Sequence, residues 1–172
     1  MYDVNAIRSD FPILSREVNG KPLVYLDNGA SAQKPQVVID AISRSYSHEY
    51  SNVHRGLHYL SNLATDQYES VRGTVARFLN AGNEDHIVFT SGTTEGINLV
   101  AYAWAMPNLQ AGDEIILSVM EHHANIVPWH FLRERQVVVI KWVDVDASGA
   151  LDPQAVIDAI TPKTKLIAVT QV

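Results

Sequence analysis

From residue 84 onward, short apolar runs rich in β-branched residues alternate with segments of helical periodicity. Such alternation predicts parallel strands joined by helical crossovers, because a helix returns the chain to the start of the next strand. The predicted strands are 86–90, 114–119, 137–143 and 165–172, with helices around 97–104, 129–135 and 153–160. We therefore predict an α/β fold in which helices cover both faces of a mostly parallel sheet, giving three layers, α/β/α.

The first 80 residues follow a different pattern. We predict a short helix at 4–8, a short strand at 23–26, and longer helices at 35–50 and 62–79. Residues 1–20 would form an N-terminal arm, and residues 21–172 would belong to one domain. The last predicted strand has no helix after it to cover it, so we expect the chain to be a fragment of a longer protein. An ordinary C-terminal strand is the alternative.

Composition narrows the class of protein. The 172 residues carry a formal charge of −6 and are 47% hydrophobic, which is typical of a globular protein. Without a basic block, nucleic acid and anionic membrane surfaces are not the expected partners. The longest aliphatic run, 137–140, is far too short to span a membrane, and residues 1–10 lack the apolar core of a signal peptide. We expect a soluble, cytoplasmic protein.

The strongest chemical motif begins with Ser91, Gly92, Thr93 and Thr94, between a predicted strand and a predicted helix. The free N–H groups and positive end of a helix N-terminus suit a phosphate, and Thr93 and Thr94 add two hydroxyl donors. The segment is neither a P-loop nor a dinucleotide-binding glycine turn. Taken alone, it also fits an ordinary helix cap.

A second motif, Glu121-His122-His123, follows the predicted strand 114–119 and therefore lies at the same sheet edge as Thr93. A neutral histidine there could stack on an aromatic cofactor and move protons near neutral pH. The alternatives are a solvated polar loop and a metal site. We expect no metal, because no matched set of carboxylates or cysteines completes such a site.

Two weaker motifs lie in the first 60 residues. His54 and His58 are four apart, as helical zinc ligands can be, but Gly56 favours a loop. Arg55 is suited to a carboxylate or phosphate, although most arginines contact only solvent. The sequence from Asn28 to Ala30 permits a close approach of the backbone, and it also fits a simple turn.

Together these segments resemble the N-terminal part of SUF-type cysteine desulfurases, which belong to the class V group of fold-type I pyridoxal-phosphate enzymes. The resemblance spans nearly the whole chain and is carried by residues 10–14, 25–35, 52–56, 91–98 and 120–129. It implies that residues 21–172 form an incomplete cofactor-binding large domain, with pyridoxal 5'-phosphate as the cofactor. It also implies an enzyme that converts L-cysteine to L-alanine and holds the sulfur as a persulfide for iron–sulfur cluster assembly.

The resemblance assigns roles to individual residues. Thr93 and Thr94 match the positions that grip the cofactor phosphate, and His122 matches the histidine that stacks on the ring and assists proton transfer. His54 and Arg55 match a segment near the active site and the dimer contact. The turn residues Asn28, Gly29 and Ala30 match the substrate side of the pocket. Members of the family form homodimers and pass sulfur to an acceptor protein.

Two covalent groups of the family are absent from the sequence. Its cofactor-binding lysine follows a histidine, and none of the five lysines does so: Lys21, Lys34, Lys141, Lys163 and Lys165. No cysteine is present to carry a persulfide, to pair in a disulfide or to bind a metal. We therefore expect the chain alone to be inactive. The alternatives are a related class V enzyme, such as a selenocysteine lyase or an aminotransferase-like enzyme, and a non-catalytic module.

Overall fold

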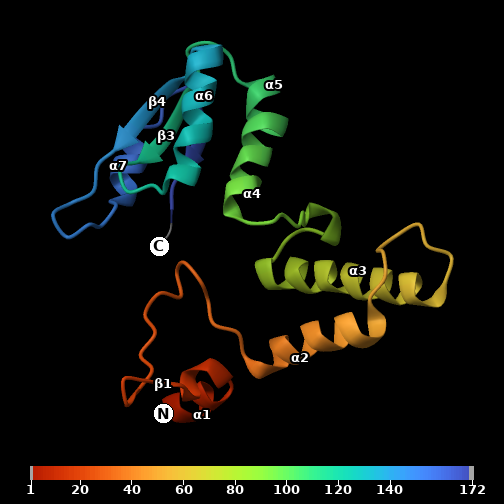
Figure 1. The fold of residues 1–172 in the computed structure, drawn as a ribbon. Helices are drawn as coiled ribbons and strands as arrows, with labels where there is room; N and C mark the ends of the chain where they lie inside the picture. Colours follow the sequence, from red (N-terminus) through yellow and green to blue (C-terminus); the bar gives the residue numbers. More distant parts are fainter. Residues whose placement is uncertain (1, 171–172) are drawn as a thin grey trace. The chain divides into compact units, whose positions relative to one another are not determined.

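The computed structural model describes residues 2–170, and the packing divides the chain into two units, 1–87 and 88–172 (Figure 1). Each unit has its own internal contacts. The division into an arm at 1–20 and a cofactor-binding domain at 21–172 is not defined by this packing and stays a prediction.

The unit 88–172 is built on three parallel strands in the order β4-β3-β5. Their bounds are Glu114–Ser118 for β3, Val139–Val143 for β4 and Thr164–Ala168 for β5. In the register of the sheet, Ile115 of β3 lies opposite Ile140 on one side and Leu166 on the other. Three successive residues of β3, Ile115 to Leu117, have no solvent exposure. The central strand is therefore covered on both faces, which explains its continuous apolar sequence.

Helices cover the two faces of this sheet. Helix α4, Thr93–Val100, continues through a π-helical turn at Ala101–Ala105 into α5, Met106–Asn108. It packs with α6, Val127–Gln136, against one face. The core there consists of Ala101, Ala105, Leu109, Ile115, Leu117, Trp129, Leu132 and Val138.

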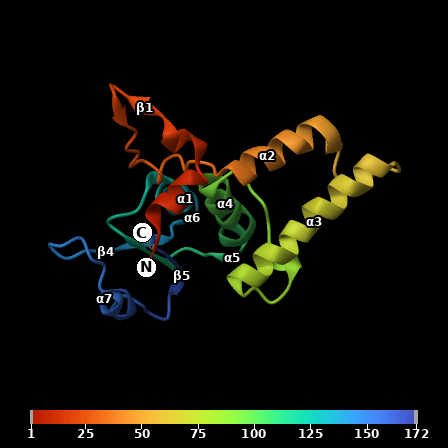
Figure 2. The same cartoon turned by 90° about the horizontal axis from the view of Figure 1, so that it is seen from below.

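The opposite face of the sheet lies next to α7, Pro153–Asp158. Lys141 is adjacent in β4 to the core-facing Ile140, so its side chain points to the other face, where Nζ donates to the carbonyl of Ala159 at 2.5 Å. Figure 2 shows the strands between α6 and α7. The predicted α/β fold with a parallel sheet and helices on both faces is confirmed.

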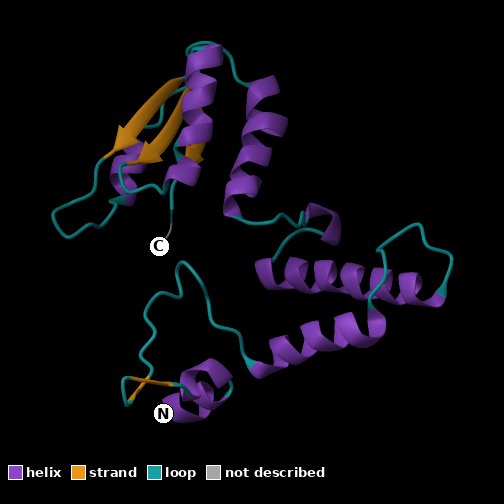
Figure 3. Ribbon diagram, viewed as in Figure 1, coloured by secondary structure: helices purple, strands orange, loops and turns teal. Residues whose placement is uncertain are grey.

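The unit 1–87 is mostly helical (Figure 3). It begins with α1, Val4–Ser9, a 3₁₀ turn at Pro12–Ser15, and an antiparallel hairpin of β1, Glu17–Val18, with β2, Lys21–Pro22. Then follow α2, Gln36–Arg44, with a π-helical turn at Ser45–Glu49; α3, Tyr59–Leu79; and a 3₁₀ turn at Glu84–His86. The predicted helices at 4–8, 35–50 and 62–79 are present, with shifted ends.

Two predicted strands are wrong. Residues 23–26 and 87–90 pair with no strand among the described residues, and residues 84–86 form a 3₁₀ turn. Val24 and Leu26 are 75% and 90% exposed. An apolar, β-branched run shows that a segment suits an extended conformation, but a strand also needs a partner for its backbone hydrogen bonds. The predicted strand at 165–172 is confirmed as β5, and its last two residues lie outside the described residues.

Across residues 2–170, every helix is too short or too polar to cross a membrane.

Candidate active site

The N-terminus of α4 carries a set of unused hydrogen-bond donors. Among the described residues, the backbone N–H groups of Thr93, Thr94 and Glu95 have no acceptor, and neither threonine hydroxyl makes a hydrogen bond. Both threonine side chains are exposed. At Gly92, the position that a Cβ atom would occupy has no other atom within 4 Å. The helix end is therefore open to a ligand that accepts several hydrogen bonds, such as a phosphate.

Glu95 sits beside these donors but is engaged elsewhere. Its Oε2 accepts hydrogen bonds from the backbone N–H and the hydroxyl of Ser91, both at 2.6 Å. These bonds, that from the hydroxyl first, hold the pKa of the Glu95 carboxyl below its usual value. Ser91 is thus occupied by Glu95, and Thr93 and Thr94 are the hydroxyls left for an anion.

His122 lies in the loop after β3, immediately before a 3₁₀ turn at His123–Asn125. Its Nδ1 accepts a hydrogen bond from the Ala124 N–H at 3.1 Å, so the proton of the neutral ring is on Nε2. The ring is exposed, and that of His123 stands edge-on to it at 6.2 Å between centroids. The exposed His122 ring is therefore accessible to a ligand, as a ring-stacking group requires.

The structure brings the two motifs of this unit together, because α4 packs directly against the 3₁₀ turn that follows His122. The prediction that Thr93, Thr94 and His122 meet at one edge of the sheet relied on a strand at 86–90, which is absent from the described chain; the packing of α4 against this turn is what brings the two motifs near each other. His122 itself follows the carboxyl end of β3.

Below the loop that carries His122 lies a network of buried polar side chains. The carboxylate of Glu121, which is 8% exposed, accepts hydrogen bonds from the Ser118 hydroxyl at 2.6 Å and from the Asn125 side-chain amide at 2.7 Å. The backbone N–H of Thr170 donates to the same carboxylate at 2.8 Å. Burial raises the pKa of Glu121, but these hydrogen bonds together outweigh it, and the pKa lies below its usual value.

Glu121 and Asn125 flank His122 in the sequence motif, but no role was predicted for either of them. The available signal was an acidic residue directly after an apolar strand, with an amide four positions later. Their partners Ala168, at the end of β5, and Thr170, just beyond it, are more than 40 residues away in sequence.

His54 and Arg55, in the other unit, form a turn with φ angles of 61° and 57°, in the left-handed region. The turn is held by α3: the His54 N–H donates to the Thr65 hydroxyl at 2.9 Å, and His54 Nε2 lies 2.8 Å from Glu69 Oε1. Hydrogen bonds from Arg72 first, and from His54, lower the pKa of Glu69. The predicted loop is confirmed. It presents Arg55 as an exposed cation.

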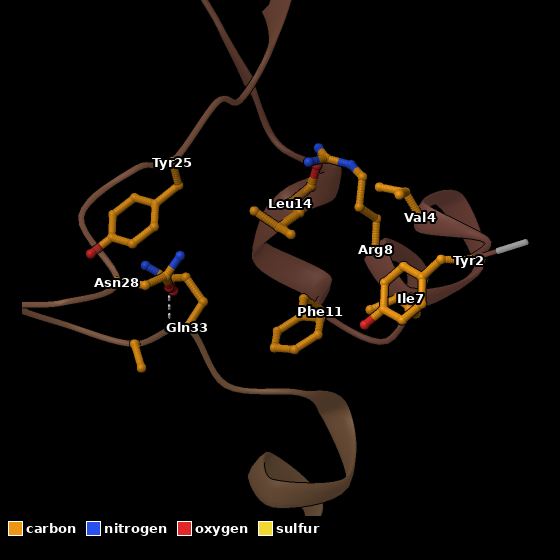
Figure 4. Close-up of a pocket in the computed structure, with 10 residues that line it drawn as sticks. Tyr2, Val4, Ile7, Arg8, Phe11, Leu14, Tyr25, Asn28 and Gln33 are labelled. Atoms are coloured by element: carbon orange, nitrogen blue, oxygen red, sulfur yellow. Dashed lines mark hydrogen bonds between the residues drawn. The ribbon is translucent and has the colours of Figure 1, made fainter. Parts of the chain in front are cut away.

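Asn28, Gly29 and Ala30 form the predicted turn, closed by the Ala30 N–H donating to the Asp27 carbonyl at 3.2 Å. The Asn28 side chain also accepts from the Gln33 N–H at 3.1 Å. Figure 4 shows Asn28 and Gln33 at one side of a mostly apolar cavity of about 420 Å³. Whether this turn faces a substrate stays a prediction.

No group of three or more potential metal ligands occurs within residues 2–170.

Residues 24–172 match the aminotransferase class-V family, and the chain belongs to that family. Within it, the chain is 51% identical to a probable cysteine desulfurase of Mycobacterium leprae, covering 100% of this chain and 28% of the relative. It is 52% identical to a cysteine desulfurase of Klebsiella pneumoniae, covering 99% of this chain and 42% of that protein.

Solved structures agree in fold. The apo cysteine desulfurase of Thermococcus onnurineus superposes with a TM-score of 0.88 and 34% identity, over 100% of this chain and 41% of that one. Cysteine desulfurase CsdA of Escherichia coli gives a TM-score of 0.78 and 37% identity, over 97% and 41% of the two chains. The chain thus spans less than half the length of these relatives.

Enzymes of this class use pyridoxal 5'-phosphate, which confirms the cofactor predicted from the sequence. The residues present fit its phosphate end, because α4 offers unpaired N–H groups, two free hydroxyls and open space at Gly92. They also fit its ring, since His122 is exposed and immediately precedes the turn that packs against α4.

Proposed function

We propose that this chain is the N-terminal, cofactor-binding part of a pyridoxal-phosphate-dependent cysteine desulfurase. The complete enzyme converts L-cysteine to L-alanine and holds the released sulfur as an enzyme persulfide for iron–sulfur cluster assembly. The observation that carries the proposal is the open N-terminus of α4 beside the turn that follows His122. The identity of the chain to two cysteine desulfurases over its whole length supports it further.

In this function, the backbone N–H groups at the start of α4 and the hydroxyls of Thr93 and Thr94 bind the phosphate. His122 lies flat against the ring and uses Nε2 to hold or move a proton. Bound pyridoxal phosphate would supply the electron sink that makes bond cleavage next to the amino group possible. Asn28, Gly29, Ala30, His54 and Arg55 are proposed to contact the substrate or a second subunit of a homodimer.

This chain contains no cysteine, and none of its lysines follows a histidine as the family's cofactor-binding lysine does. A covalent intermediate cannot be replaced by binding residues, so the chain by itself is proposed to be inactive. The partners proposed for the complete enzyme are L-cysteine and a sulfur-acceptor protein of the SUF system, and its location is the cytoplasm.

The test is an assay of the full-length gene product for alanine and sulfide formation from L-cysteine in the presence of a thiol. An absorbance scan from 300 to 500 nm reports bound cofactor. His122→Ala should keep the bound cofactor but lose most of the activity, and the isolated chain 1–172 should have none. Preference for selenocysteine would identify a selenocysteine lyase, and amino transfer an aminotransferase-like enzyme. A full-length product without bound cofactor would contradict the proposal and leave a non-catalytic module.

A further inference from the structure

The loop that carries His122 has little secondary structure of its own. Between the end of β3 and the start of α6, the described chain forms only the 3₁₀ turn at His123–Asn125. Such a short turn fixes few side chains by itself. The orientation of an exposed ring on this loop must therefore depend on the residues that anchor it from below.

Glu121 is the first of these anchors. Its Oε1 accepts from the Ser118 hydroxyl, on β3, and from the Thr170 N–H, just beyond β5, while its Oε2 accepts from Asn125. The carboxylate thus joins the loop to the carboxyl ends of two neighbouring strands. The Asn125 amide nitrogen and the Thr170 N–H can only donate, and they face different oxygens of the carboxylate, so a carboxylate satisfies both and a side-chain amide cannot.

Asn125 is the second anchor, at the other side of His122. Its side-chain amide also donates to the Ala168 carbonyl at 3.0 Å, and its Oδ1 accepts from Trp129 Nε1 at 2.9 Å. Because the indole N–H can only donate, Oδ1 must face Trp129, and the amide nitrogen must face Glu121. Trp129 is 2% exposed in the core, so the anchor is as rigid as the core.

We propose that Glu121 is a positioning residue, whose buried carboxylate, through Asn125 and the ends of β3 and β5, sets the orientation of the His122 ring toward the cofactor. The inference rests on the proposed function for what the ring does. The anchoring itself rests on the hydrogen bonds and does not depend on the reaction. Glu121 and His122 are adjacent in the chain, so a rotation of the Glu121 backbone moves the ring directly.

Glu121→Gln is the sharpest perturbation. The substitution keeps the size of the side chain but directs an N–H group at one of its three donors, which breaks one link and leaves a buried donor without an acceptor. The matched control is Glu114→Gln at the opposite end of β3, where the carboxylate accepts from the Thr161 and Thr164 hydroxyls, which can rotate to suit an amide.

In the full-length enzyme, we expect Glu121→Gln to lower kcat for alanine formation about tenfold. The KM for cysteine should change less than about twofold, and the visible absorbance maximum of the bound cofactor should shift. The control should retain wild-type values. In cofactor-free protein, the ¹⁵N shifts of the His122 ring should change in Glu121→Gln and not in Glu114→Gln. Ser118→Ala, which removes one donor and keeps the charge, should give a smaller change in the same direction.

An unchanged kcat and absorbance maximum in Glu121→Gln would overturn the inference, as would a lower melting temperature with unchanged ring shifts. If Glu121→Gln does not fold, Ser118→Ala provides the same three readouts. The inference and the proposed function can fail independently. Even if the wild-type protein binds no cofactor, the ¹⁵N shifts of the His122 ring can still be compared between Glu121→Gln and Glu114→Gln.

Discussion

The open end of α4 makes a specific prediction about the threonines. Thr93→Val and Thr94→Val each replace a hydroxyl by a methyl group of similar size. Neither hydroxyl makes a hydrogen bond within residues 2–170, and both side chains are exposed. Removing the hydroxyls therefore breaks no hydrogen bond of the folded protein, and the melting temperature should shift by less than about 2 °C. The affinity for a phosphate-bearing ligand should fall.

The size of that loss follows from the geometry. A hydrogen bond to a charged group contributes about 1.5–3 kcal/mol, and an exposed position favours the lower end of this range. At 1.4 kcal/mol per factor of ten, each variant should lose about tenfold in affinity and the double variant about a hundredfold. The N–H groups of α4 remain in both, and their charge–dipole attraction of about 0.3–1 kcal/mol keeps residual binding.

Pyridoxamine 5'-phosphate and pyridoxamine are the ligands for the assay, because neither needs a lysine to bind covalently. Fluorescence titration of cofactor-free, full-length protein gives the dissociation constant of each ligand. The dissociation constant of pyridoxamine divided by that of pyridoxamine 5'-phosphate isolates the contribution of the phosphate. This ratio should fall in Thr93→Val and Thr94→Val and stay unchanged in Thr74→Val, on the surface of α3. An unchanged ratio in the double variant would refute the assignment of α4 as the phosphate site.

Three further predictions concern stability, measured by urea denaturation. Leu117→Ala removes a core side chain with no solvent exposure, and the free energy of unfolding should fall by about 3–5 kcal/mol; a loss below about 1 kcal/mol would contradict the described core. Gly56→Ala should destabilise by about 1–3 kcal/mol, because its methyl group would overlap the buried side chain of Ser61, and an unchanged midpoint would show that the turn can relax. Hydrogen bonds to Glu114, that from Thr161 first, lower the pKa of its carboxyl in the folded protein. Glu114 therefore stabilises the fold at pH values above its usual pKa, and this stabilisation is lost as the pH falls through the lower pKa of the folded state. Glu114→Gln should make the free energy of unfolding fall less steeply with decreasing pH, and an equally steep fall in the variant would contradict the prediction.

The sequence predicted the sheet well, both for the buried central strand β3 and for its partly exposed neighbours β4 and β5. Strands β3, β4 and β5 occur close to the predicted positions, because each is a compact run whose pattern fits a strand between two layers. The helical stripe after Thr94 was less accurate. Within the helix predicted around 97–104, Ala101 is buried, but the larger Val100 and Trp104 are 44% and 43% exposed. The helix turns small residues toward the sheet, and a π-helical turn shifts the stripe, which no count of hydrophobic residues reveals.

The candidate site was predictable as far as it is local. Thr93 and Thr94 begin a helix that the sequence indicates, and His122 follows the carboxyl end of a strand that it also indicates; the strand predicted before Thr93 is absent from the described residues. The hydrogen bonds of Glu121 and Asn125 were not predictable, because they depend on β5 pairing with β3 at a separation of more than 40 residues. Long-range pairing of this kind is set by the tertiary fold.

The two parts of the site, the Glu121–Asn125 network and the N-terminus of α4, differ in whether their polar groups have hydrogen-bond partners. At Glu121 and Asn125, the polar groups are matched: the carboxylate accepts from three donors, and the amide contacts three groups. Such closure is what a buried framework needs, since an unmatched polar group there would destabilise the fold. At α4, the donors are left open, which folding alone does not require. A closed network beneath His122 and an open helix end beside it therefore indicate different roles: the network holds the site's geometry, and the helix end receives the ligand.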